Sequence, residues 1–501
     1  MNPTTVAVAR VGPRRYDAAP PFSPCAPYPE YRLGHLSHEN GCYAGVRDAL
    51  RLLGLDAQRY GSAQWNPLGG IVRPGDRVVV KPNLIWHSHR SRADEWEQVI
   101  THGSVVRAIV DYVLLALEEE GYVCIADGPQ RDADWDCVLE RTGLGAVCDF
   151  YGGVSDVPVE LLDLRTEFLT VRGDVAFGAS PLPGDPLGER VVDVGPHSRF
   201  GMSLGVEFHG ADYDEAETNT HHHGAVHEYA LAETVARADV FINVPKMKTH
   251  KKVGVTLGLK NAVGVTTQRN WLPHYTTRVS DGAGDQFPSH TLRNRSERAG
   301  IRSLQRLTNH HARFAPTFAL AKRLAKPFWG DTQRVVRSGN WYGNDTCWRM
   351  VHDVYRALLY FGQDGLPHSE PKRSFTLIDG IIAGEGNGPE VPDAFAAGVL
   401  VAGENVVAVD CVATKAMGFD PAKIPLLREA FATSRLPLAD FNASDICLVS
   451  DEQAWSCRLD DMPTSTSLGL RPHFGWTGHI ELDGRRQRWP TFDSEAQPGE
   501  S

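Results

Sequence analysis

The chain has 501 residues, with 51 lysines and arginines against 62 aspartates and glutamates, so its formal net charge at pH 7 is −11. Hydrophobic residues make up 42% and charged residues 23%, values typical of a globular protein with a large buried core. This composition excludes global disorder and a small disulfide scaffold, and the length predicts two or more lobes.

Targeting signals and membrane spans are not expected. The N-terminal sequence MNPTTVAVAR lacks the basic region, apolar run and cleavage site of a secretory signal. The most apolar helix-like stretch, residues 105–117, contains Arg107 and Asp111 and is shorter than the roughly 20 residues that cross a bilayer. The nine cysteines are scattered without a CxxC pair, which indicates reduced thiols rather than a disulfide, zinc or iron–sulfur framework. These patterns predict a cytoplasmic protein.

Strand-like and helix-like patterns alternate along the chain. The predicted strands, which are apolar and rich in β-branched residues, span residues 6–10, 77–81, 122–126, 239–244, 375–378, 398–402 and 446–449. The predicted helices span residues 46–53, 106–117 (ending before Gly121), 229–238 and 348–358, the last with Asp345 as its expected cap. The alternation predicts an α/β fold of mainly parallel sheets covered by helices, in two lobes, with a site crevice at the carboxyl ends of the strands.

Composition divides the chain into four expected segments. Residues 1–290 are predicted to form an N-terminal α/β domain that carries a site loop rich in lysine and histidine. A basic, largely helical insertion is expected over 291–370, and a second α/β lobe over 371–450. Residues 451–501 are expected to be an irregular tail without a chemical motif.

The basic insertion concentrates positive charge. Residues 291–337 hold eleven lysines and arginines against Glu297 and Asp331, a net charge of +9 that leaves −20 for the rest of the chain. Such a stretch can bind an anionic membrane surface, a nucleic acid or an anionic substrate. The favoured interpretation is an insertion packed against the acidic body of the same protein. Peripheral contact with an anionic membrane stays open, and no nucleic acid partner is expected.

The most informative stretch follows the predicted strand 239–244, which ends at Pro245. Six cationic or imidazole side chains crowd within fifteen positions, and glycines stand at 254, 258 and 264: Lys246, Lys248, His250, Lys251, Lys252 and Lys260. Glycine lets the backbone approach a ligand closely, and neighbouring ammonium groups lower one another's pKa. A lowered pKa makes a lysine usable as a base or nucleophile. The cluster therefore predicts an anion site at a strand end.

Other predicted strand ends supply further candidates, because ligands of open α/β sheets bind beyond the carboxyl ends of the strands. The candidate catalytic residues are His250, Lys260 and Lys248. The candidate substrate-binding residues are Lys81, Asn83, Asp127, Lys246, Asn261 and Asn387. The candidate ligands of a divalent metal are His227, His274, Asp379 and Glu385. For Asp410, helix capping and a site role are about equally favoured, and the run His221 to His223 is more typical of a polar loop than of a site.

Several common enzyme classes are excluded by missing motifs. The chain has no GxxxxGK[ST] phosphate loop, no GxGxxG fingerprint, no GxSxG elbow and no HExxH pair. Standard P-loop ATPases, Rossmann dehydrogenases, serine hydrolases and zincins are therefore not expected.

Long motifs occur in a fixed order: GDRVVVKPNL (75–84), ADGP (126–129), ADVFINVPKMKTHKKVGVTLGLKNAVG (238–264), DGIIAGEGNGP (379–389) and GENVVAVDCVATKAMGFDPAKIP (403–425). On these motifs the sequence resembles the bacterial and archaeal domain of unknown function 362, over roughly residues 1 to 450. The segments NWLPHY (270–275), GDQFP (284–288) and NWYGNDTCWRM (340–350) look like a subgroup often encoded near polysaccharide or secondary-metabolite genes. Some relatives carry a ferredoxin-like cysteine domain, which this chain lacks.

A more distant resemblance is to the nickel-pincer lactate racemases. His250, Gly254, Gly258 and Lys260 reproduce the spacing of that family's site loop, in which the histidine is an acid/base and the lysine tethers the cofactor. The family's second catalytic histidine has no counterpart, and Gln130 stands near its place. The resemblance implies a shared fold and a shared position of the site. The missing histidine argues against a two-base racemase. It also disfavours a nickel-pincer cofactor but does not exclude one.

These patterns lead to one main hypothesis and two alternatives. The main hypothesis is an enzyme that acts on a small carboxylated or phosphorylated metabolite by acid/base chemistry, isomerase- or lyase-like and open to assistance by a divalent metal, with its cofactor unknown. The first alternative is a redox enzyme that works with an iron–sulfur partner. The second is a non-catalytic protein that binds a polyanion or a membrane surface through its basic segment.

Overall fold

The computed structural model describes residues 2–16, 19–37, 40–172, 175–210, 215–279, 282–289, 335–485 and 489–492. Of the predicted basic insertion, 291–370, residues 291–334 lie outside the described residues, and the described remainder contains the helix Cys347–Tyr360. No helix among the described residues is long and apolar enough to cross a membrane.

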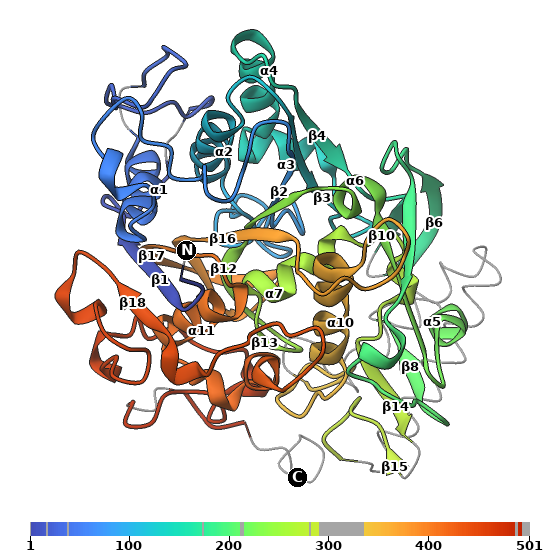
Figure 1. Cartoon of the computed structure of the whole chain (residues 1–501). Helices are drawn as coiled ribbons and strands as arrows, with labels where there is room; N and C mark the ends of the chain where they lie inside the picture. Colours follow the sequence, from blue (N-terminus) through green and yellow to red (C-terminus); the bar gives the residue numbers. More distant parts are fainter. Residues whose placement is uncertain are drawn as a thin grey trace.

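A large central sheet organises the chain (Figure 1). Its main path runs β18-β1-β17-β16-β11-β2-β3-β4, and β12 and β13 join it beside β16. The strands are β1 (Thr5–Arg10), β2 (Arg77–Pro82), β3 (Tyr122–Asp127), β4 (Val159–Asp163), β11 (Val240–Val244), β12 (Lys246–His250), β13 (Gly254–Val255), β16 (Arg373–Asn387), β17 (Val391–Gly403) and β18 (Cys447–Val449). Six of its pairings are parallel, and β17 and β13 pair antiparallel with their neighbours. The α/β fold with a mainly parallel sheet is thus confirmed.

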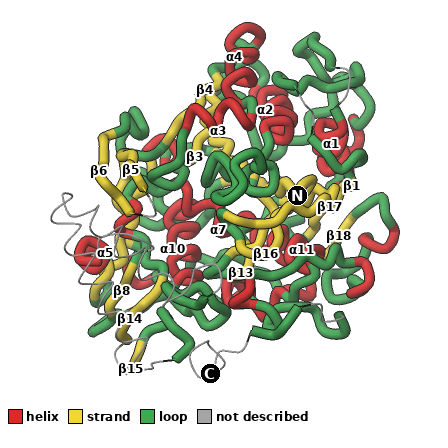
Figure 2. The backbone as a smooth tube through the Cα atoms, turned by 180° about the vertical axis from the view of Figure 1, so that it is seen from behind, coloured by secondary structure: helices red, strands yellow, loops and turns green. Residues whose placement is uncertain are grey.

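Alternate side chains of the central strands enter different cores, because successive residues of a strand point to opposite faces. Val78 and Val80 of β2 pack in one core, and Val79 between them packs in the other. Helices cover both faces, as the view from behind shows (Figure 2). The first face is covered by α1 (Gly41–Leu52), α2 (Gly103–Leu117), α3 (Trp135–Thr142) and α4 (Leu144–Val154). The second is covered by α6 (Glu233–Ala236), α7 (Leu257–Asn261), α10 (Cys347–Tyr360), α11 (Val406–Met417) and α12 (Pro425–Arg428).

Smaller sheets extend the molecule to one side (Figure 1). They contain β7 (Glu189–Asp193), β10 (Val226–Ala232) and β9 (His222–His223); β8 (Glu207–His209), β14 (Tyr275–Val279) and β15 (Gly282–Ala283); and the pair β5 (Glu167–Arg172) and β6 (Val175–Pro181). Helix α5 (Glu215–His221) leads directly into β9. The described part of the C-terminal tail has only short 3-10 turns: Gln453–Trp455, Thr464–Thr466 and Phe474–Trp476.

Most predicted elements are confirmed, and two details are wrong. Residues 229–232 are not helical but continue strand β10, which pairs antiparallel with β7, so tertiary pairing overrides the helical propensity of this segment. The N-cap of α10 is Thr346 and not Asp345, and Asn344 Oδ1 accepts from the backbone N–H groups of Thr346 and Cys347. All nine cysteines are free thiols. Strands β16 and β17, from the segment 371–450, lie in the same sheet as β1, β2 and β11.

Candidate functional site at the strand ends

Strands β11 and β12 run in succession beside the long strand β16. Asn243 of β11 pairs with Thr376, and after Pro245 the parallel pairing resumes with Lys246 opposite Asp379. On its other side β11 pairs with β2, which places Asn243 opposite Lys81. The register therefore brings the predicted strand-end residues of β2, β12 and β16 to one edge of the sheet, as the parallel arrangement requires.

Lys81 and Asp127 form a buried ion pair. The Lys81 Nζ lies 2.6 Å from Asp127 Oδ1, and Asp127 Oδ2 accepts from the backbone N–H of Leu84 at 2.6 Å. Asn261 accepts from Lys81 Nζ at 3.2 Å and from Asn83 Nδ2 at 2.9 Å through the same oxygen. Burial lowers the pKa of Lys81, and the Asp127 carboxylate opposes that shift. Four of the predicted site residues thus form one network that is satisfied internally.

Gly264 is required by this network. A Cβ at this position would lie 2.2 Å from Asp127 Oδ1 and 2.6 Å from Lys81 Nζ, closer than any real contact. The backbone carbonyl of Gly264 accepts from the N–H of Gly128 at 2.9 Å, which fixes the approach. The glycine therefore lets the segment after α7 pack directly against the ion pair.

Lys246 and Asp379 form a second buried pair. The Lys246 Nζ lies 3.0 Å from Asp379 Oδ2, and Tyr16 donates its hydroxyl to Asp379 Oδ1 at 2.6 Å. The backbone N–H of His102 also donates to this carboxylate, at 3.1 Å, and the His102 ring stacks on Tyr16 with centroids 4.1 Å apart. Burial lowers the pKa of Lys246 and raises the pKa of the Tyr16 hydroxyl well above its usual value. The backbone N–H of Ile381 donates to Oδ1 at 3.3 Å, so Asp379, a predicted metal ligand, is used by four donors of the protein.

Lys248 is the contrasting case, because no carboxylate among the described residues pairs with it. Its fully buried Nζ donates to Asn83 Oδ1 at 3.0 Å and to the carbonyl of Val99 at 2.5 Å. Burial lowers the pKa of Lys248 well below its usual value, and the charge of Lys246 adds to the shift. The lowered pKa makes the neutral amine, the form that acts as a base or nucleophile, more accessible than in an exposed lysine.

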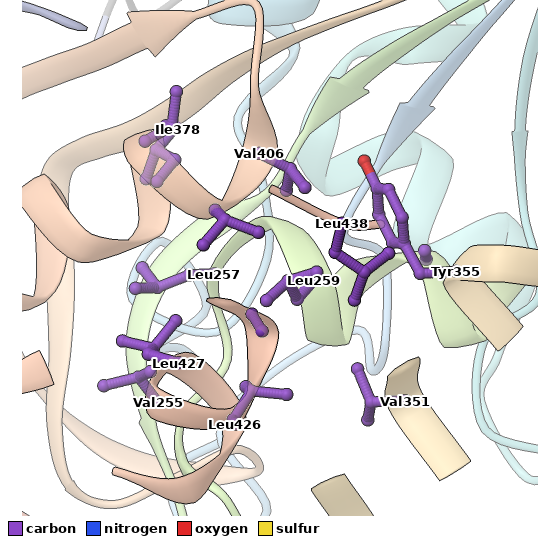
Figure 3. Packing of buried hydrophobic residues seen from close by; sticks show 14 of the residues in the cluster. Val255, Leu257, Leu259, Val351, Tyr355, Ile378, Val406, Leu426, Leu427 and Leu438 are labelled. Carbon is purple, nitrogen blue, oxygen red and sulfur yellow. The ribbon is translucent and has the colours of Figure 1, made fainter. Parts of the chain in front are cut away.

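Helix α7, which carries Lys260 and Asn261, is held by an apolar packing and a buried carboxylate. Leu257 and Leu259 belong to the hydrophobic cluster that includes Val351 of α10 and Leu426 of α12 (Figure 3). Asp410 of α11 accepts from the N–H groups of Gly258 at 2.7 Å and Leu259 at 2.8 Å. Burial raises the pKa of Asp410 to about 7. Asp410 lies inside α11, whose N-cap is Asn405, so it does not cap its own helix; its carboxylate instead accepts from the first turn of α7.

Leu257 starts α7 with a left-handed backbone, at φ +41°. Such a conformation in a leucine costs of order 1–3 kcal/mol and persists only where the surroundings impose it. Here the buried side chain and the two hydrogen bonds to Asp410 supply that constraint. The strain lies three residues before Lys260, at the point where the site loop turns into the helix.

His250 and Lys260 form the most basic part of the site. The His250 Nδ1 accepts from the backbone N–H of Lys252 at 3.1 Å, so the neutral ring carries its proton on Nε2. Burial lowers the pKa of His250 well below its usual value, and Lys260, Lys251, His274 and Lys252 lower it further. Burial likewise lowers the pKa of Lys260, which has no hydrogen-bond or ion-pair partner among the described residues. The structure thus brings the predicted catalytic histidine and lysine together.

His274 joins this group from the segment before β14. Its Nδ1 donates to the carbonyl of Leu272 at 2.8 Å, which leaves the lone pair of the neutral ring on Nε2. Burial lowers the pKa of His274 well below its usual value, with further lowering by Lys252 and Lys260. His250 and His274 are therefore held in opposite tautomers.

Glu390 neutralises the outer edge of the cluster. It pairs with Lys251 at 3.4 Å and with Arg90 at 3.0 Å, and it accepts from Gln130 at 2.7 Å. Although burial opposes ionisation, Lys251, Arg90 and Gln130 lower the pKa of Glu390 to about 2. Gln130, which stands near the place of the racemase histidine, is therefore engaged by this carboxylate.

The four predicted metal ligands do not form a metal centre. Glu385 accepts from the backbone N–H of Arg471 at 2.9 Å, and His227 faces the carbonyl of Gly201 at 2.9 Å. Asp379 is paired with Lys246, and His274 lies beside His250. No group of three or more histidine, cysteine, aspartate or glutamate side chains suited to a metal occurs in the part of the chain that the structure describes. Asn387 ends β16, beside the segment that pairs Gly388 with Lys251.

Sequence reasoning missed several residues that shape the site. The C-terminal tail contributes Trp476, whose Nε1 donates to the carbonyl of Lys251 at 2.9 Å and whose ring covers Gly254. Tyr16 comes from the N-terminal segment and Glu390 from the turn after β16. Only Glu390, next to the motif DGIIAGEGNGP, carried a sequence signal that could have found it.

Comparison with known proteins assigns the family. The model described as "Domain of unknown function (DUF362)" matches residues 78–184 and 191–415. The chain belongs to this family. It is also similar to a protein of Synechocystis sp. named "Thylakoid-associated protein sll1697", with 22% identity over 364 residues. That alignment covers 72% of this chain and 70% of the relative.

Proposed function

We propose that the protein is an enzyme that binds a small carboxylated or phosphorylated metabolite and transfers a proton on it, as an isomerase or a lyase does. One observation carries the proposal: Lys248 and Lys260 have no carboxylate partner among the described residues, although Lys81 and Lys246 beside them are paired. Unpaired cationic or basic groups at the strand ends are suited to an anionic ligand.

The opposite tautomers of the two histidines suggest their roles. Neutral His250 presents Nε2–H and can donate a hydrogen bond that polarises a substrate oxygen, and His274, whose Nδ1 donates to Leu272, is a candidate base. Lys260 would hold the anionic group of the substrate, and Lys248 is a second candidate base. Lys81, Asn83, Asp127 and Asn261 bond one another, and Lys246 is paired with Asp379, which suits positioning of the loop better than direct substrate contact. Asn387 stays a candidate for substrate contact.

The test separates binding from proton transfer. Thermal-shift titration with inorganic phosphate, 2-hydroxy acids and sugar phosphates identifies an anion that stabilises the protein. Proton NMR in D₂O then measures exchange of carbon-bound hydrogen in that compound. We expect Lys260→Met to abolish the thermal shift, and His250→Gln to keep it while exchange falls by at least about 100-fold. The control His368→Gln changes an exposed histidine and should alter neither. Unchanged exchange in His250→Gln would refute the assignment.

The proposal keeps the expected cytoplasmic location, and the subgroup resemblance implies a role in polysaccharide or secondary-metabolite biosynthesis. A second candidate is association with an anionic membrane surface, favoured by the net charge of +9 in residues 291–337 and by the relative's printed name. It predicts salt-sensitive sedimentation with phosphatidylserine vesicles that survives His250→Gln and is lost when Arg302, Arg306 and Arg313 are neutralised together.

A further inference from the structure

Two histidines outside the strand-end site face each other in the β9–β10 hairpin. His222 and His227 are directly opposite in the antiparallel register, and their side chains are fully buried, with 1% and 0% of each residue exposed. Their Nδ1 atoms are 3.3 Å apart. Sequence analysis favoured a polar loop for this histidine run, whereas the structure gives a paired strand with converging imidazoles.

The outer nitrogens of both rings meet backbone carbonyls. His222 Nε2 lies 2.5 Å from the carbonyl oxygen of Trp271, and His227 Nε2 lies 2.9 Å from that of Gly201. A carbonyl oxygen can only accept, so each contact requires a proton on Nε2. A neutral imidazole carries one proton, and both Nδ1 atoms are then left with lone pairs. The geometry thus turns two lone pairs toward each other, which is repulsive unless a positive species lies between them.

We propose that His222 and His227 bind one transition-metal ion through their Nδ1 atoms. Two nitrogen ligands at about 2.0–2.1 Å from a tetrahedral ion are about 3.3–3.4 Å apart, which matches the observed separation. Donation of the second ring nitrogen to a backbone carbonyl is also how metal-bound histidines are commonly oriented.

Aromatic side chains surround the two imidazole rings. Phe200 stacks on His227 with centroids 5.3 Å apart, Phe208 packs against both rings, and Asp193 accepts from the backbone N–H of His227 at 2.9 Å. A third histidine, cysteine or carboxylate ligand is absent from the described residues, so at least one position stays open to a non-protein ligand. Zn²⁺ and Cu⁺ both accept neutral imidazole, and the test treats them as separate arms.

The ion would join three segments that are distant in sequence. The hairpin supplies both ligands, and the carbonyls of Gly201 and Trp271 come from the preceding loop and from the segment that leads to His274. Metal binding is therefore expected to stabilise the position of that segment. This inference does not depend on the proposed function.

The experiment uses the full-length protein, stripped with a chelator and then titrated with each ion. Competition with a chromophoric chelator measures Zn²⁺ affinity, and competition with bicinchoninate under anaerobic conditions measures Cu⁺ affinity. We expect one equivalent of one ion to bind, and binding to weaken at least about 100-fold in His222→Gln and in His227→Gln, because loss of an outer-shell partner alone costs 10–100-fold. His223→Gln, which changes the exposed neighbour, is the matched control and should bind like the parent protein.

X-ray absorption of the loaded parent protein keeps the test decisive if a variant does not fold. A coordination shell of the bound ion that contains two imidazole nitrogens supports the site, and a coordination shell without imidazole overturns it. Failure of both ions to bind at micromolar concentration, or equal binding by His222→Gln and the parent, also overturns it and leaves a shared proton as the explanation of the contact.

Discussion

Replacing Lys248 by methionine tests whether its buried amine is uncharged in the folded protein. Methionine keeps most of the aliphatic volume and removes the donor to Asn83 Oδ1 and the Val99 carbonyl. Leaving buried acceptors without a partner costs about 1–3 kcal/mol each, so the variant should be less stable than the parent at high pH. A second contribution to the stability difference between the variant and the parent depends on pH and favours the variant.

The sign follows from proton binding in the two states. An unfolded lysine is protonated below about pH 10.4, whereas burial lowers the pKa of Lys248 in the folded protein well below that value. Between the two pKa values the unfolded state holds the extra proton, so the parent loses up to about 1.4 kcal/mol of stability for each unit that the pH falls. Lys248→Met lacks this loss. Its stability relative to the parent should therefore rise as the pH is lowered from 9.5 to 7.5.

Urea unfolding followed by circular dichroism at pH 7.5, 8.5 and 9.5 measures this difference. Lys251→Met is the matched control, because it removes a more exposed lysine of the same loop that pairs with Glu390. A difference between Lys248→Met and the parent that stays constant with pH would show that the amine is charged in both states. It would also remove Lys248 from the list of candidate bases.

Three further predictions concern the framework of the site. Lys81→Met should lower the free energy of unfolding by about 3–5 kcal/mol, because it leaves the Asp127 carboxylate buried without its counter-ion. The double variant Lys81→Met/Asp127→Leu should lose less stability than the sum of the single changes, and additive losses in urea unfolding would contradict a coupled pair. Gly264→Ala should lower the melting temperature by several degrees, since its Cβ would lie 2.2 Å from Asp127 Oδ1, and an unchanged melting curve would rule out the close approach. Asp410→Asn should gain stability relative to the parent as the pH rises from 5 to 7, because the parent carboxyl, with a pKa of about 7, keeps a proton that the unfolded chain has already lost. If calorimetric scans show a stability difference between variant and parent that does not change over this range, the pKa of Asp410 is not raised.

The strands of the central sheet were predictable because each is a short apolar run bounded by turn residues. Residues 77–81, 122–126 and 239–244 match β2, β3 and β11 to within one or two positions. The helix expected over 229–238 was wrong in its first half because the pattern of Glu228 to Ala232 carries no trace of its partner β7, almost forty residues earlier. Pairing between distant segments is decided by packing, which a local pattern cannot show.

The part of the site that follows strand β11 was predictable, because a single motif, residues 238–264, contains its basic residues. Lys246, Lys248, His250 and Lys260 lie together as the motif implied, but their sequence gave no means of separating the paired lysine from the unpaired one. That distinction depends on Asp379, which reaches Lys246 through the register of β12 on β16. The metal assignment grouped residues by type, and it missed that His227 faces His222 across a hairpin turn.

The distribution of carboxylates across the site explains why the proposed chemistry lies at its outer end. Asp127 and Asp379 neutralise the lysines nearest the sheet, and Glu390 neutralises Lys251 at the edge. Between these pairs the protein places buried Lys248, half-buried Lys260 and buried His250 without an acidic partner among the described residues, at a cost in stability that the pKa shifts express. Such a cost is expected at a site that receives an anion, because the ligand then supplies the missing counter-charge. Anion binding should therefore raise the pKa of Lys260 and His250 toward their usual values. When a stabilising anion binds near neutral pH, the protein should accordingly take up protons. Calorimetric titration in buffers of different ionisation enthalpy measures this uptake directly. Binding without proton uptake would count against this account.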